Sequence, residues 1–224
     1  SQIAVWKQAF KAELAAINGK HYAQVLLDLV KAFERVPFAL LVREATALGV
    51  NLAVLRLSIA TYRLARTVRV DGVFAAAVLP TRGILAGSVF ATAELKMVLM
   101  RVVDRAHLAH PSVTPTIYVD DTSAEALGSP RHIISVLPPF VRMICDDMAA
   151  DGLEVSTTKG QCTASAAWIA HAVIEALNEP VAANAGAISS GPGPALPAAA
   201  PATAPATAPV VAAGRTKRIT STWE

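Results

Sequence analysis

Hydrophobic positions follow two different periods along the first 178 residues of this chain. Apolar residues three and four positions apart are typical of amphipathic helices, whereas short aliphatic runs ended by charge indicate buried strands. The helical pattern predicts helices over residues 3–17, 37–48, 52–65, 89–104, 131–150 and 166–177. The strand pattern predicts strands over residues 22–29, 67–70, 73–78, 114–119, 123–127, 153–155 and 161–164.

Turn-forming residues mark several boundaries between these elements. Asp71-Gly72 stands between two predicted strands and is typical of a two-residue hairpin turn. Asn51 is expected to cap the helix that follows it. Pro138 and Pro139 lie inside a predicted helix and are expected to break it or to start it afresh. Strands and helices mix along the chain, and some strands form hairpins, so we predict an α+β fold with an antiparallel sheet and helices packed on one face.

The composition changes sharply at residue 180. Residues 180–214 consist largely of Pro, Ala and Thr, with few large side chains to bury, which predicts disorder. The chain is therefore divided into one folded domain, residues 1–178, and a disordered Ala/Pro/Thr-rich linker, residues 179–224, with a short basic cluster near its end.

Charge is also distributed unevenly. The formal net charge is +3, yet residues 1–110 hold fourteen Lys and Arg against seven Asp and Glu, while residues 111–224 hold six against ten. The basic half is expected to attract polyanions such as nucleic acid. Arg56, Arg63, Arg66 and Arg69 recur near helical spacing, which fits a phosphate track or a solvated helix face.

The sequence also bears on cellular location. No cationic start leads into an apolar segment of the signal-peptide type. The longest apolar stretch, residues 84–103, contains Glu94, Lys96 and Arg101 and is too polar for a membrane span. Cys145 and Cys162 lack a metal-binding spacing and are expected to be reduced thiols. We therefore expect an intracellular protein without membrane contact, in the nucleus or the cytoplasm.

Two predicted strands carry carboxylates at their ends. Asp28 ends the strand that begins near residue 22, and Asp120 and Asp121 form the tip of the hairpin between residues 114 and 127. If these strands are neighbours, the three carboxylate side chains lie close together and repel one another. Proteins usually offset such repulsion by binding a divalent cation. This arrangement suits two Mg²⁺ ions about 3.5–4 Å apart, which promote phosphoryl transfer. Mn²⁺ has similar ligand preferences.

The same stretches resemble motifs of one protein family. Residues 27–37, with the sequence Leu-Asp-Leu-Val-Lys-Ala-Phe-Glu-Arg-Val-Pro, resemble the first catalytic motif of reverse transcriptases from non-LTR retroelements. Tyr-Val-Asp-Asp at 118–121 is similar to their second aspartate motif, residues 82–88 to their glycine-rich loop, and residues 152–159 to their lysine-bearing motif. Four motifs in the family's order cover about residues 20–165. The resemblance implies a polymerase palm with partial fingers, and hence an RNA-directed DNA polymerase that uses an RNA template, a DNA primer and dNTPs.

The resemblance also implies roles for individual residues. Asp28 and Asp120 are expected to bind both metal ions, Asp121 to be a further ligand or to have a secondary role, and Lys159 to donate a proton to pyrophosphate or to act as a nearby charge. The backbone from Leu29 to Ala32 is expected to hold phosphates, and Phe33 to exclude a 2′-hydroxyl and so to select deoxynucleotides. Gly83, Gly87 and Ser88 are expected to contact the template or the base pair.

Other interpretations remain open at this point. Without the resemblance, each Asp fits a turn or cap, Phe33 fits a core position, and Lys159 fits a solvated loop. Ala86 stands where the family usually has a polar residue, and only twenty-seven residues precede Asp28, which favours a catalytically impaired relic or a nucleic-acid-binding module with the same fold. A phospho-receiver domain has its Asp pair before the single Asp, the reverse of the order here. Phe33 and the Tyr-Val-Asp-Asp sequence argue against an RNA-dependent RNA polymerase.

Overall fold

A four-stranded sheet forms the centre of the computed structural model, which describes residues 2–179. Its strand order is β4-β5-β1-β6, and all neighbouring strands are antiparallel. The strands are β1 (His21–Leu27), β4 (Val113–Tyr118), β5 (Asp121–Gly128) and β6 (Gln161–Ala164). The predicted α+β class is confirmed. Beyond Glu179, the predicted disordered linker lies outside the described residues.

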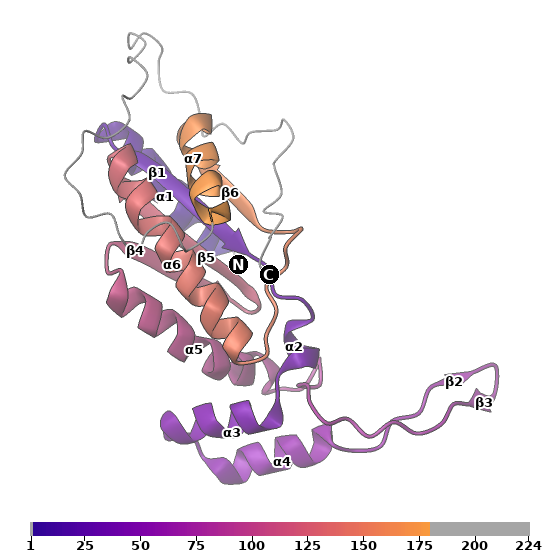
Figure 1. Ribbon diagram of the computed structural model, residues 1–224. Coiled ribbons are helices and arrows are strands. Elements are labelled where there is room, and N and C mark those ends of the chain that lie inside the picture. Colours follow the sequence, from indigo (N-terminus) through magenta and orange to yellow (C-terminus); the bar gives the residue numbers. More distant parts are fainter. Residues whose placement is uncertain (1, 180–224) are drawn as a thin grey trace.

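One face of the sheet is apolar and forms the core. Alternate residues of β1, Ala23, Val25 and Leu27, are buried on this face, as the two-residue period of a strand requires. Three helices pack on it: α5 (Ala91–Ala109), α6 (Pro130–Ala150) and α7 (Ala167–Asn178). Figure 1 shows α6 and α7 lying across the sheet. Burial of these apolar side chains is the main term stabilising the fold.

The opposite face of the sheet is polar, and α1 (Gln2–Ile17) packs against it. Gln24 and Glu125, paired in register on β1 and β5, are both buried there. Lys11 of α1 places its Nζ 2.8 Å from Glu125 Oε2 and so neutralises a carboxylate that is costly to desolvate. The expectation that the helices lie on one face is therefore wrong for α1. The buried Glu125 carboxylate on the polar face needs a cation, and Lys11 of α1 supplies it.

Helix α6 runs through Pro138 and Pro139 without a break. The predicted interruption is wrong, although each proline lacks an N–H donor, which in a helix interior costs about 3 kcal/mol. Six large apolar side chains of α6 are buried on both sides of the prolines, and their packing outweighs this local cost: Ile133, Leu137, Phe140, Val141, Ile144 and Met148.

A smaller helical part adjoins the sheet through α5. It contains α2 (Ala32–Arg35), α3 (Phe38–Ala47) and α4 (Leu52–Tyr62), and the Asn51 side chain caps α4 as predicted, accepting from the Ala53 amide at 2.9 Å. The predicted hairpin at Asp71-Gly72 is present but short, with β2 (Arg69–Val70) and β3 (Val73–Phe74). Its strands are exposed, and it extends away from the rest of the molecule in Figure 1. The predicted strand 153–155 is reduced to one bridge between Leu29 and Val155.

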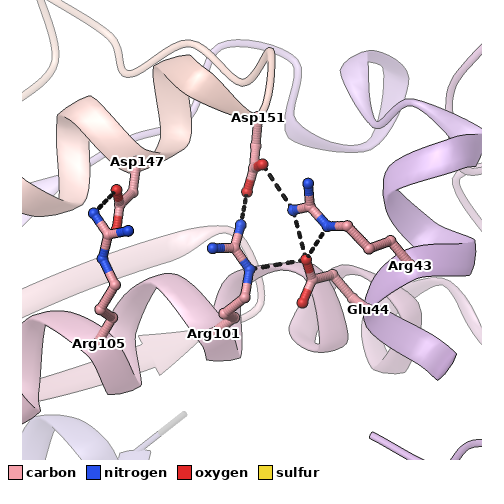
Figure 2. A network of polar contacts seen from close by, with 6 residues as sticks. All are labelled: Arg43, Glu44, Arg101, Arg105, Asp147 and Asp151. Atoms are coloured by element: carbon pink, nitrogen blue, oxygen red, sulfur yellow. Dashed lines mark hydrogen bonds and ion pairs between the residues drawn. The ribbon is translucent and has the colours of Figure 1, made fainter. Parts of the chain in front are cut away.

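An ion-pair network joins α3 to the helices on the sheet (Figure 2). Glu44 of α3, with a side chain only 2% exposed, accepts from Arg43 Nε at 2.7 Å and from Arg101 Nε at 2.9 Å. Both guanidinium groups also bind Asp151, which follows α6. Because one Arg comes from α3 and the other from α5, the network connects three helices through two buried carboxylates.

Both cysteines are free thiols, in agreement with the expected reduced state. Burial raises the pKa of each thiol to about 12, so neither is a thiolate near neutral pH. Every helix within residues 2–179 is too short or too polar to cross a bilayer.

Candidate active site at the end of the sheet

The ends of β1 and β5 bring the candidate acidic residues to the same edge of the sheet. Leu27 pairs with Thr122 as the last register pair, so Asp28 follows β1 at the point where Asp121 begins β5. Tyr118 pairs with Asp121 across the β4–β5 hairpin, which leaves Val119 and Asp120 as its two-residue turn. The neighbouring strands assumed from sequence are thus β1 and β5, and their adjacency places all three Asp residues together.

The hairpin turn itself has an unusual backbone. Val119 has a φ of 59°, a left-handed conformation that a β-branched residue rarely adopts. Strain of this kind costs about 1–3 kcal/mol and is common at functional sites. Asp120 lies in this turn, as expected from the sequence, whereas Asp121 is the first residue of β5.

Electrostatic coupling supports the proximity of these groups. The pKa of Asp121 is raised by partial burial first, and then by the negative charges of Asp120 and Asp28, while the positive charge of Lys159 lowers it. Lys159 Nζ lies 3.1 Å from Asp28 Oδ2. This contact is an ion pair without hydrogen-bond alignment, since Oδ2 is buried and has no hydrogen-bond donor among the described residues. Three carboxylates and one ammonium therefore share one electrostatic environment.

Backbone contacts hold the lysine-bearing segment next to Asp28. The Ser156 amide donates to the Asp28 carbonyl at 2.7 Å, and the Val30 amide donates to the Glu154 carbonyl at 2.8 Å. Arg35 closes the other side through an ion pair with Glu154. The buried Ser156 hydroxyl then accepts from the Lys159 amide at 3.2 Å. These four linked contacts place Lys159 close enough to reach Asp28, and none of them could be inferred from the spacing of residues in the sequence.

These contacts alter one expectation about phosphate binding. Leu29 has a buried side chain that belongs to the core, and the amide of Val30 is already used by Glu154. The Val30 amide, part of the backbone expected to hold phosphates, is therefore already used in a hydrogen bond within the protein. Lys31, with a left-handed φ of 50° and an exposed side chain, lies next to it and presents a positive charge.

The glycine-rich loop is attached to the segment that follows Asp28. The Gly83 amide donates to the Val36 carbonyl at 2.8 Å, and the Ile84 amide donates to the Phe33 carbonyl at 2.7 Å. A Cβ at Gly83 would lie 2.9 Å from the Glu34 carbonyl oxygen, so this close approach requires glycine. Phe33, half-buried, packs against the core. Within residues 2–179, no hydrogen bond joins this loop to the three Asp residues.

The chemistry of the donors fits magnesium, although their placement does not form a closed site. Carboxylate oxygens are the ligands that Mg²⁺ prefers, and the buried, undonated Oδ2 of Asp28 has capacity for a cation. Within residues 2–179, no group of three or more His, Cys, Asp or Glu side chains is arranged to hold a metal ion. Lys159 instead supplies the positive charge at Asp28.

The sequence matches none of the protein-family models and none of the curated proteins with which it was compared. The geometry of this site and the resemblance of its motifs are therefore the grounds for a function.

We expect the coupling between these groups to be measurable. Asp28→Asn should lower the pKa of Asp121 because it removes a nearby negative charge, and Lys159→Met should raise it because it removes a positive one. Side-chain carboxyl NMR titration without divalent metal measures both shifts. Asp104→Asn, on the exposed side of α5, serves as a control that leaves Asp121 unchanged. An unchanged Asp121 pKa in Asp28→Asn would show that these two carboxylates are not neighbours.

Proposed function

We propose that this chain is an RNA-directed DNA polymerase that adds dNTPs to a DNA primer. The observation that carries the proposal is the meeting of Asp28, Asp120, Asp121 and Lys159 at one edge of an antiparallel sheet. Asp28 lies 92 positions before Asp120, and Lys159 lies 38 positions after Asp121. All four residues belong to the motifs that resemble reverse transcriptases. The α+β fold, with its antiparallel sheet, is compatible with a polymerase palm.

In this proposal Asp28, Asp120 and Asp121 would hold two Mg²⁺ ions, which would lower the pKa of the primer 3′-hydroxyl and neutralise phosphate charge. The 3′-hydroxyl gives its proton to water, its oxygen bonds to the α-phosphorus, the bond from that phosphorus to the bridging oxygen breaks, and pyrophosphate leaves. Lys159 is a flexible cation, 70% exposed at its side chain, that donates a proton to this leaving group. Phe33 excludes a 2′-hydroxyl, and the exposed Arg56, Arg63, Arg66 and Arg69 attract the nucleic-acid backbone.

Three observations favour a second function, a catalytically impaired relic or nucleic-acid-binding module with this fold. Ala86 has no polar side chain to bind a nucleotide, and it is exposed in the glycine-rich loop. Lys159 already pairs with the proposed metal ligand Asp28. The carboxylates of the described residues form no closed group of metal ligands. In this alternative the chain binds nucleic acid without extending it.

Primer extension separates the two functions. The whole chain is incubated with a labelled DNA primer on an RNA template, dNTPs and Mg²⁺, and we expect extension that stops when the metal is chelated. Parallel reactions with rNTPs should give little product, because Phe33 excludes the 2′-hydroxyl. Binding of the same template-primer is measured by fluorescence anisotropy. Binding without extension, in Mg²⁺ and in Mn²⁺, would support the relic and end the polymerase proposal.

A further inference from the structure

A buried polar chain ends at the glycine-rich loop. Tyr62, the last residue of α4, is 1% exposed, and its hydroxyl lies 2.6 Å from Glu94 Oε2 and 2.9 Å from Ser88 Oγ. Glu94 lies in the first turn of α5 and is 3% exposed. A phenol has one hydrogen, and an ionised carboxylate only accepts. Tyr62 therefore donates to Glu94, and Ser88 donates to Tyr62.

The buried contacts of Tyr62, Glu94 and Ser88 orient the glycine-rich loop rather than stabilise the fold. Glu94 is buried, and among the described residues it has no Lys, Arg or His within ion-pair distance. A buried carboxylate without a cation is costly to desolvate, and apolar side chains would fill the same space at lower cost. What the polar chain adds is a defined direction for the Ser88 hydroxyl, and hence a defined position for the end of the loop.

The loop is thus fixed at both ends and open in the middle. Its first residues, Gly83 and Ile84, are hydrogen-bonded to the segment after Asp28, and Ser88 is held by Tyr62. Between these ends, Leu85, Ala86 and Gly87 are exposed. Gly87 has a φ of 92° with open space where a Cβ would lie, so its backbone is accessible to a ligand.

We propose that Tyr62 and Glu94 are positioning residues that hold the glycine-rich loop, through Ser88, in the conformation that accepts the incoming nucleotide. The inference rests on the proposed polymerase function and deepens it. It also changes the role of Ser88, whose hydroxyl is directed into the protein towards Tyr62 and accepts the Phe90 amide at 3.4 Å. Ser88 anchors the loop, and the exposed backbone at residues 85–87 is the part that meets the nucleotide.

The test is a double-mutant cycle on Tyr62→Phe and Ser88→Ala. Each variant should raise the KM for dNTP about tenfold, the loss expected for one hydrogen bond involving a charged network, and should leave kcat within about twofold. The double variant should show about the same tenfold rise, because both changes break one chain of contacts. Glu94→Gln keeps an acceptor for Tyr62 and should give a smaller rise.

A second measurement follows the loop directly. Hydrogen exchange of the amides of residues 85–90 should be faster in Tyr62→Phe than in the intact chain. Tyr22→Phe is the matched control, since Tyr22 is also buried but bonds to Gln24 at the far end of β1 from Asp28. It should change neither the KM nor exchange in this loop.

The outcomes separate this inference from the proposed function. If the intact chain extends primers, two results would overturn the positioning role. One is a KM increase in the double variant equal to the product of the two single increases. The other is a Tyr62→Phe variant with the same KM and loop exchange as Tyr22→Phe. If the intact chain extends nothing, the polymerase proposal and the nucleotide assignment fall together, and exchange alone decides whether Tyr62 holds the loop. Should Tyr62→Phe fail to fold, Glu94→Gln and Ser88→Ala carry both measurements.

Discussion

Asp28→Asn is expected to lower primer extension by at least about 1,000-fold while the chain stays folded. Metal-assisted stabilisation of a phosphoryl-transfer transition state supplies several kcal/mol, and each 1.4 kcal/mol corresponds to a factor of about ten. Asn keeps the size of the side chain and removes its charge. It also removes repulsion with Asp121, which offsets the lost ion pair with Lys159, whose side chain is largely solvated.

Single-turnover extension rates, with circular dichroism as the test of folding, measure this effect. Asp120→Asn should behave in the same way, whereas Asp146→Asn, on the exposed side of α6, should keep the full rate. Template-primer affinity should be unchanged in all three variants, because the proposed ligands act on the metal rather than on the nucleic-acid backbone. An Asp28→Asn chain that retains a tenth of the rate would place the chemistry elsewhere.

In the ion-pair network of Figure 2, removal of an arginine should lower the stability of the fold more than removal of a carboxylate. Arg101→Met leaves Glu44, 2% exposed, and Asp151, 6% exposed, with Arg43 as their remaining partner, and it should lower the free energy of unfolding by about 3 kcal/mol. Glu44→Gln should cost less, about 1 kcal/mol, because Arg43 and Arg101 are half-exposed and can be solvated.

Urea unfolding at neutral pH measures both values, with Arg56→Met as the control. Arg56 is exposed on α4 and makes no ion pair within the described part of the chain, so its replacement should change stability by less than about 0.5 kcal/mol. Equal losses for Arg101→Met and Glu44→Gln would mean that both sides of the network are solvated in the folded state, contrary to the burial of its carboxylates.

Local patterns in the sequence predicted most of the elements correctly. A short apolar run ended by charge identified β1, the Asp-Asp pair identified the tip of the β4–β5 hairpin, and Asn51 identified the start of α4. These features depend on a residue and its near neighbours, since strand period, turn conformation and helix capping are set within a few positions. The candidate aspartates could be named for the same reason, because each ends a short apolar run.

What the sequence determined by itself is thus the class of fold, the order of its elements and the residue types available for metal-assisted chemistry. Only the tertiary structure decided that α6 continues through two prolines, that α1 covers the polar face, and that Lys159 reaches Asp28. It also decided that Tyr62, Glu94 and Ser88 form one chain of contacts. The physical reason is that burial and charge pairing between distant residues contribute several kcal/mol, which exceeds local propensity and depends on neighbours that no sequence window contains.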